Sequence, residues 1–84
     1  MKFLALFKPY KLINDLSEAQ EIVSRMQRFG SVEKVYVSFG VVFAVINANK
    51  SDEAVMIAHY AGLTPLKAWA IEFETDNEGN LVEV

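Results

Sequence analysis

Only a few side chains in this sequence have the chemistry of a catalytic or ligand-binding group. His59 is the single histidine, and an imidazole can act as a general acid or base because it titrates near neutral pH. Tyr10 stands next to Lys11 and close to Lys8, a grouping that can bind a carboxylate or a phosphate. His59 and Tyr10 are therefore the candidates for catalysis, although neither residue is assigned a reaction by its neighbours in the sequence.

Three further side chains are candidates for ligand binding: Tyr60 and Trp69 can contact an apolar or aromatic molecule, and Lys8 can bind an anion. Each candidate also has a structural interpretation. His59 fits a helix surface or an interface, and Tyr10 fits a solvated loop. Tyr60 follows a segment that is apolar nearly all round, and Trp69 alternates along a strand, so both fit a buried core.

The composition excludes several classes of site. The chain has no cysteine, which removes disulfides, thiolate zinc sites, iron–sulfur clusters and a cysteine nucleophile. A single histidine without converging carboxylates predicts no metal site, and no glycine-rich phosphate loop or other cofactor motif occurs. A net charge of −3 and a pI near 5.0 disfavour a nucleic-acid partner, whose binding surface should be basic.

Length and hydropathy predict a single small domain spanning residues 1–84. Hydrophobic residues make up 52% of the chain, which is typical of a packed core rather than a disordered segment. The apolar run Phe3–Phe7 ends at Lys8, too early for a signal peptide or a membrane span. We therefore expect a cytoplasmic protein without membrane contact.

Hydrophobic periodicity predicts strands and helices in alternation. The expected strands are 3–8, 32–39, 41–48, 67–75 and 81–84; the expected helices begin at Ser17 and at Ser51 or Asp52 and end near 29 and 61. Ser17 and Gln20 are spaced as a capping box, and Gly30 and Gly62 are placed as left-handed helix stops.

The resulting order is strand–helix–strand–strand–helix–strand with a short fifth strand, an α+β arrangement called ferredoxin-like. Right-handed crossovers place both helices on one face of an antiparallel sheet, with the first and third strands in its centre. The first and last core strands are then neighbours. We expect modest cross-strand pairing between them, for instance of Lys2 with Glu74.

The strands contain too many apolar residues for a sheet with one face in water. We assign alternate residues to the helix side, including Phe43, Val45, Trp69 and Ile71. The remainder form a second apolar face, whose members are Leu4, Leu6, Tyr36, Val42, Ala44, Ile46, Ala68 and Ala70. Such a patch exceeds what soluble monomers expose, which predicts a homodimer through this sheet face, with Leu4, Leu6, Tyr36, Val42, Ala44 and Ile46 at the interface. The tail strand can pair with the partner's sheet edge. The alternative is that the faces are misassigned and the patch is ordinary core.

The strand order, the two-sided sheet, the Asp52–Ala54 opening of the second helix and the closing 69–75 strand resemble the dimeric α+β barrel superfamily, in particular its small families of unknown function and its muconolactone-isomerase-like proteins. The resemblance covers most of residues 2–75 and is architectural. It implies a homodimer with a cavity between helices and sheet.

Three functional hypotheses follow. The first is a homodimer that binds a small apolar or aromatic molecule. The second is a cofactor-free isomerase or monooxygenase that uses His59 or Tyr10. The third is a ligand-sensing regulatory or assembly module without catalysis. Residue patterns alone do not choose between them, because a fold of this kind hosts many functions.

Overall fold

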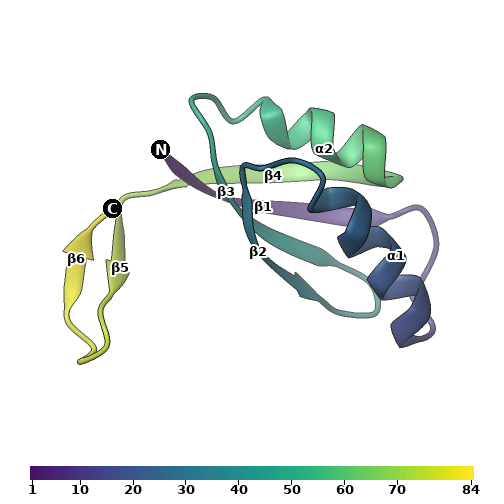
Figure 1. Cartoon of the computed structure of the whole chain (residues 1–84), viewed down its shortest axis with the longest axis horizontal. Coiled ribbons are helices and arrows are strands. Elements are labelled where there is room, and N and C mark those ends of the chain that lie inside the picture. The colour runs from purple at the N-terminus through teal and green to yellow at the C-terminus, as the bar shows by residue number, and fades with distance from the viewer.

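The computed structural model describes all 84 residues and has two helices against one face of a four-stranded sheet (Figure 1). The elements in chain order are β1 (Lys2–Pro9), α1 (Leu16–Met26), β2 (Val32–Val37), β3 (Val42–Asn47), α2 (Glu53–Ala61), β4 (Leu63–Ile71), β5 (Phe73–Thr75) and β6 (Leu81–Glu83). The sheet order is β2-β3-β1-β4, antiparallel throughout, and β5 and β6 form a separate hairpin. The predicted ferredoxin-like α+β fold is confirmed.

Helix α1 begins with a different cap from the predicted one. Asp15 is the N-cap, and its Oδ1 accepts a hydrogen bond from the Glu18 backbone N–H at 2.9 Å. The Glu18 carboxylate in turn accepts from the backbone N–H of Asn14 at 2.8 Å. Asp15 and Glu18 therefore form the capping arrangement of α1. The predicted capping box of Ser17 and Gln20 is wrong, because the N-cap lies two residues earlier, at Asp15.

Of the two predicted helix ends, one is confirmed and one is wrong. Gly62 ends α2 in the left-handed conformation, with φ 76°, and its N–H donates to the Ala58 carbonyl, as predicted. Asp52 is the N-cap of α2 but makes no side-chain capping bond. Helix α1 ends earlier than predicted, at Met26, and Gly30 does not have a positive φ. The prediction that Gly30 stops this helix is therefore wrong.

The register of the two central strands determines what is buried. Ala5 of β1 lies opposite Ala44 of β3, and Phe7 lies opposite Val42. All four side chains are fully buried and belong to the core that α1 and α2 cover, together with Ile57 of α2. The helix-covered face thus carries the odd-numbered residues of β1 and the even-numbered residues of β3.

Strand β4 lies at the sheet edge and starts earlier than predicted, at Leu63. Pro65 lies within it, beside a register shift between Leu6 and Phe7 of β1, which is tolerated because an edge strand needs fewer ladder hydrogen bonds. The predicted 67–75 strand is interrupted after Ile71, since Phe73–Thr75 leaves the sheet and pairs with β6. We call residues 72–84 the C-terminal arm.

The molecule exposes more surface than a compact chain of its mass. Its accessible surface is 5775 Å², whereas a monomer of 9.4 kDa is expected to expose about 5,000 Å². The radius of gyration, 13.1 Å, also exceeds the value of about 12 Å expected for this length. Figure 1 shows the arm projecting from the rest of the chain, which is an extended shape.

The burial pattern of α2 gives a direct test of the core. Ile57 is fully buried, whereas Val55 on the same helix is more than half exposed. We expect Ile57→Ala to lower the free energy of unfolding by about 2–5 kcal/mol, since it leaves a cavity, and Val55→Ala to change it by less than about 0.5 kcal/mol. Urea denaturation of the two variants measures the difference. Equal losses would contradict the assigned orientation of α2.

Candidate interface and ligand cleft

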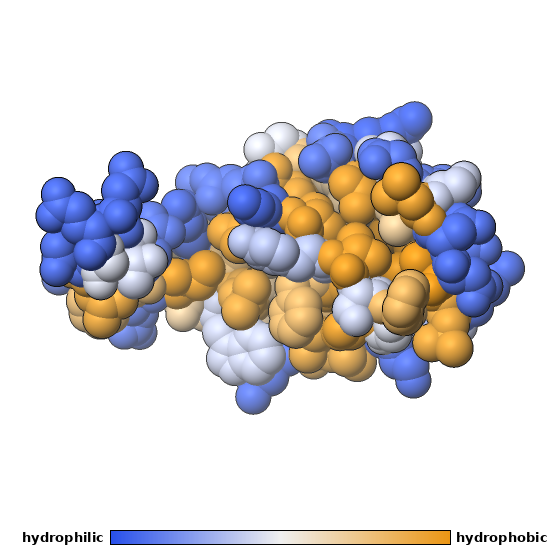
Figure 2. All heavy atoms as spheres, turned by 90° about the horizontal axis from the view of Figure 1, so that it is seen from below, coloured by the Kyte–Doolittle hydropathy of each residue, from blue (hydrophilic) through white to orange (hydrophobic).

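The face of the sheet turned away from the helices is open and mostly apolar. The register places Trp69 beside Leu4 and places Tyr36 beside Phe43, all on this side. We call it the open face; its apolar members are Leu4, Leu6, Tyr36, Phe43, Val45, Trp69 and Ile71. Figure 2 looks onto the molecule from below and shows apolar side chains across much of this side, with hydrophilic residues toward its ends.

The predicted second apolar face is therefore corrected on β3 and β4, and the predicted interface on β3. Val42, Ala44 and Ile46 are 0%, 0% and 1% exposed because they pack beneath their own helices, so they cannot contact a partner through the open face. Phe43 and Val45 occupy the open face in their place. Strand β3 is apolar on both sides, so its periodicity does not choose a face, and a one-residue shift exchanges them all.

The same exchange occurs on β4. Ala68 packs against the core, and Ala70, two residues further on, shares its side of the sheet, whereas Trp69 and Ile71 lie on the open face. The residues that α2 buries are Ala54, Ile57, Ala58 and Ala61, of which three are alanines. The helix side of β4 therefore carries Ala68 and Ala70, and the larger side chains of Trp69 and Ile71 lie on the open face. Of the predicted interface residues, Leu4, Leu6 and Tyr36 do lie on the open face.

Two lysines stand over aromatic rings of the open face. The Lys67 ammonium lies 5.1 Å from the centre of the Trp69 ring, and that of Lys34 lies 5.7 Å from the Tyr36 ring. Both distances are within the range of cation–π attraction. Neither lysine has a carboxylate partner, since the only ion pairs in the chain involve Lys2 and Arg25.

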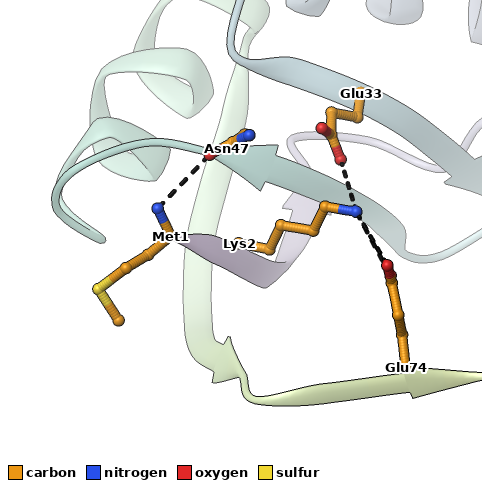
Figure 3. A network of polar contacts seen from close by, with 5 residues as sticks. All are labelled: Met1, Lys2, Glu33, Asn47 and Glu74. Carbon is orange, nitrogen blue, oxygen red and sulfur yellow. Dashed lines mark hydrogen bonds and ion pairs between the residues drawn. The ribbon is translucent and has the colours of Figure 1, made fainter. Parts of the chain in front are cut away.

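Lys2 joins the arm to the sheet. Its ammonium lies 3.3 Å from the Glu74 carboxylate on β5 and 3.5 Å from that of Glu33 on β2 (Figure 3). The hydrogen bond to Glu74, with the nearby charge of Glu33, raises the pKa of Lys2 above its ordinary value. The contact predicted between Lys2 and Glu74 is therefore present.

A cleft of about 420 Å³ lies between the start of α1 and the turn from β2 to β3. Its walls are mostly apolar, with Asp15 and Ser38 as the polar exceptions; the apolar lining residues are Ile13, Leu16, Ala19, Val37 and Phe39. A hydrogen bond from the Ile13 N–H to the Phe39 carbonyl, 3.0 Å long, holds its two sides together. We call it the α1 cleft. Its volume is within the range of small-molecule sites.

Sequence patterns did not indicate the α1 cleft. Leu16 precedes the helix expected from Ser17, and Phe39 ends the strand expected over 32–39. Both side chains line the cleft and are largely exposed. An apolar residue that directly follows the helix N-cap, as Leu16 follows Asp15, was the available signal. That Leu16 and Phe39 line the same cleft depends on how the β2–β3 turn packs against the start of α1.

The candidate catalytic residues are not brought into a site. His59 is exposed on α2, and Tyr10 is exposed after β1, where its ring lies alongside Gly62. Neither lines the α1 cleft or the smaller cleft that Leu66 and Ala54 line beside α2. No group of three or more His, Cys, Asp or Glu side chains is placed to hold a metal ion.

The candidate ligand-binding residues have separate positions. Tyr60 packs edge-on against Phe29, and its hydroxyl accepts a 2.7 Å hydrogen bond from Arg28. This side chain therefore links α2 to the segment that follows α1. Trp69 lies on the open face, so its prediction as a core residue is wrong. Lys8 is exposed opposite Thr64 and lines neither cleft.

Comparison of the chain with protein-family models, with curated proteins and with solved structures finds no match. The strand order and register by themselves define a ferredoxin-like α+β fold with an open apolar sheet face. Neither helix is long and apolar enough to cross a membrane.

The turn of the arm depends on one carboxylate. Asp76 Oδ1 accepts hydrogen bonds from the backbone N–H groups of Glu78, at 2.9 Å, and Asn80, at 3.0 Å. These bonds, that of Asn80 above all, hold the pKa of Asp76 below its ordinary value of 3.8.

Because the folded-state pKa of Asp76 is lowered, its ionised carboxylate stabilises the turn above pH 3.8, and this contribution is lost as the pH falls through the lower, folded value. We expect the amide signals of Glu78 and Asn80 to shift with a midpoint below pH 3.8 in an NMR titration. Asp76→Asn should abolish that transition. A midpoint at or above 3.8 would contradict the capped turn.

Proposed function

We propose that this protein acts as a homodimer of the dimeric α+β barrel type, formed through its open face, and that it binds a small apolar or aromatic molecule. The observation that carries the dimer is the open face itself. Its centre is occupied by Leu4, Leu6, Phe43 and Val45, with the aromatic rings of Tyr36 and Trp69 toward the edge strands. Apolar faces of this extent are typical of interaction sites.

A second copy is the occupant that fits best. Under twofold symmetry the same patch serves both partners, so one apolar face is enough to form the interface. Aromatic side chains are also enriched at the centre of such interfaces.

The α1 cleft supports the ligand. Leu16 and Phe39 offer an apolar wall, and Ser38 can hydrogen-bond a single polar group of the ligand. The catalytic alternative has no comparable support, because His59 and Tyr10 do not line this cleft. A regulatory or assembly role without chemistry remains compatible with the same dimer.

The dimer is tested on the open face. Light scattering at micromolar concentration should give twice the 9.4 kDa of one chain. Phe43→Glu places a charge at the centre of the open face and should return the mass to one chain. The matched control Met56→Glu, on the exposed side of α2, should remain dimeric. A parent chain with the mass of a single subunit would overturn the proposal.

The ligand site is tested with 1-naphthol as an aromatic probe. We expect NMR amide shifts at Ile13, Leu16 and Phe39 with a dissociation constant below about 1 mM. Leu16→Ser with Phe39→Ser should weaken binding at least about tenfold, since two apolar contacts are lost. The control Leu66→Ser, on the separate cleft, should not weaken it. Shifts confined to other residues would contradict a site in the α1 cleft.

A further inference from the structure

The C-terminal arm has apolar side chains but little to pack against. Phe73 and Leu81 are 55% and 69% exposed, and Val82 and Val84 are also exposed. An isolated two-stranded hairpin is only marginally stable in water. The ion pair of Lys2 with Glu74 fastens the arm at its base, while the strands and the turn extend away from the sheet (Figure 1).

The register gives the arm one mixed face. Phe73 lies opposite Glu83, and Leu81 lies opposite Thr75, so these four side chains share a side of the hairpin. This face combines apolar groups with a carboxylate. It has the composition of a surface that meets apolar residues bordered by cations.

The charges of the arm and the open face are complementary. Residues 72–84 contain five acidic residues and no basic one: Glu72, Glu74, Asp76, Glu78 and Glu83. The open face presents Lys34 and Lys67 without a carboxylate partner in their own chain. In Figure 1 the arm extends to the side opposite the helices, which is where a partner would lie in a face-to-face dimer.

We propose that the arm of each copy lies between the two open faces of the dimer and crosses the partner's from β2 to β4. Phe73 and Leu81 then contact its apolar side chains, and Glu78 and Glu83 lie near Lys34 and Lys67 at its two edges. This proposal rests on the dimer proposed above. It states that a second copy of this chain covers the mixed face of the arm. We call this mutual placement of the two arms the exchange. It explains why the arm carries apolar side chains that its own subunit does not cover.

The test uses two full-length double variants. The arm variant is Glu78→Lys with Glu83→Lys, and the face variant is Lys34→Glu with Lys67→Glu. Each places like charges opposite one another in its own homodimer, so we expect each to raise the dimer dissociation constant about tenfold or more at low salt, less at 1 M salt. Lys11→Glu with Lys50→Glu, the same charge change in exposed loops, should leave it unchanged.

Mixing the arm variant with the face variant distinguishes two arrangements: an arm that lies on the partner's open face and an arm that folds back onto its own. In an exchanged heterodimer every arm meets a face of opposite charge, so the mixture should form heterodimers about tenfold tighter than either homodimer. If each arm covers its own open face, mixing gives no gain, and the proposal is overturned.

The apolar contribution is tested separately with Phe73→Ser and Leu81→Ser, both outside the folded core. We expect the double variant to weaken the dimer at least tenfold by sedimentation. A dimer that is indifferent to all arm variants would overturn the exchange and leave the dimer standing. A parent chain that is a single subunit would overturn both.

Discussion

The pairing of Ala5 with Ala44 across the two central strands is the constraint on which the rest of this structure depends. It places two of the smallest side chains at the middle of the helix-covered face. Phe7, Val42 and Ile57 then fill the space around them and are fully buried. Because strand residues alternate sides, this one register also decides every side chain of the opposite face.

The opposite face is where the structure departs from a self-contained domain. Phe43 and Val45 are turned away from the helices by the same register that buries Val42 and Ala44. The C-terminal arm leaves the sheet after Ile71 and extends to the same side. Surface and arm are both apolar without a covering element, which is why a second copy is a more economical explanation than two unrelated features.

The two candidate catalytic residues lie on the surface rather than in an enclosed site. His59 and Tyr10 are both exposed, and neither meets the α1 cleft. The cleft depends on the packing of the β2–β3 turn against the start of α1 and has few polar groups.

Sequence alone determined the element order, the central position of β1 and β3 and the end of α2 at Gly62, because these follow from local periodicity, chain connectivity and glycine's freedom at positive φ. The predicted contact of Lys2 with Glu74 is present, but Glu74 makes it from β5, outside the sheet, and not from a strand paired with β1. It also indicated a surplus of apolar residues for one sheet face. Only the tertiary structure decided which residues carry that surplus. Strands such as β3 and β4 are apolar on both sides, so the choice between Val42 and Phe43 depends on the long-range register of the strands.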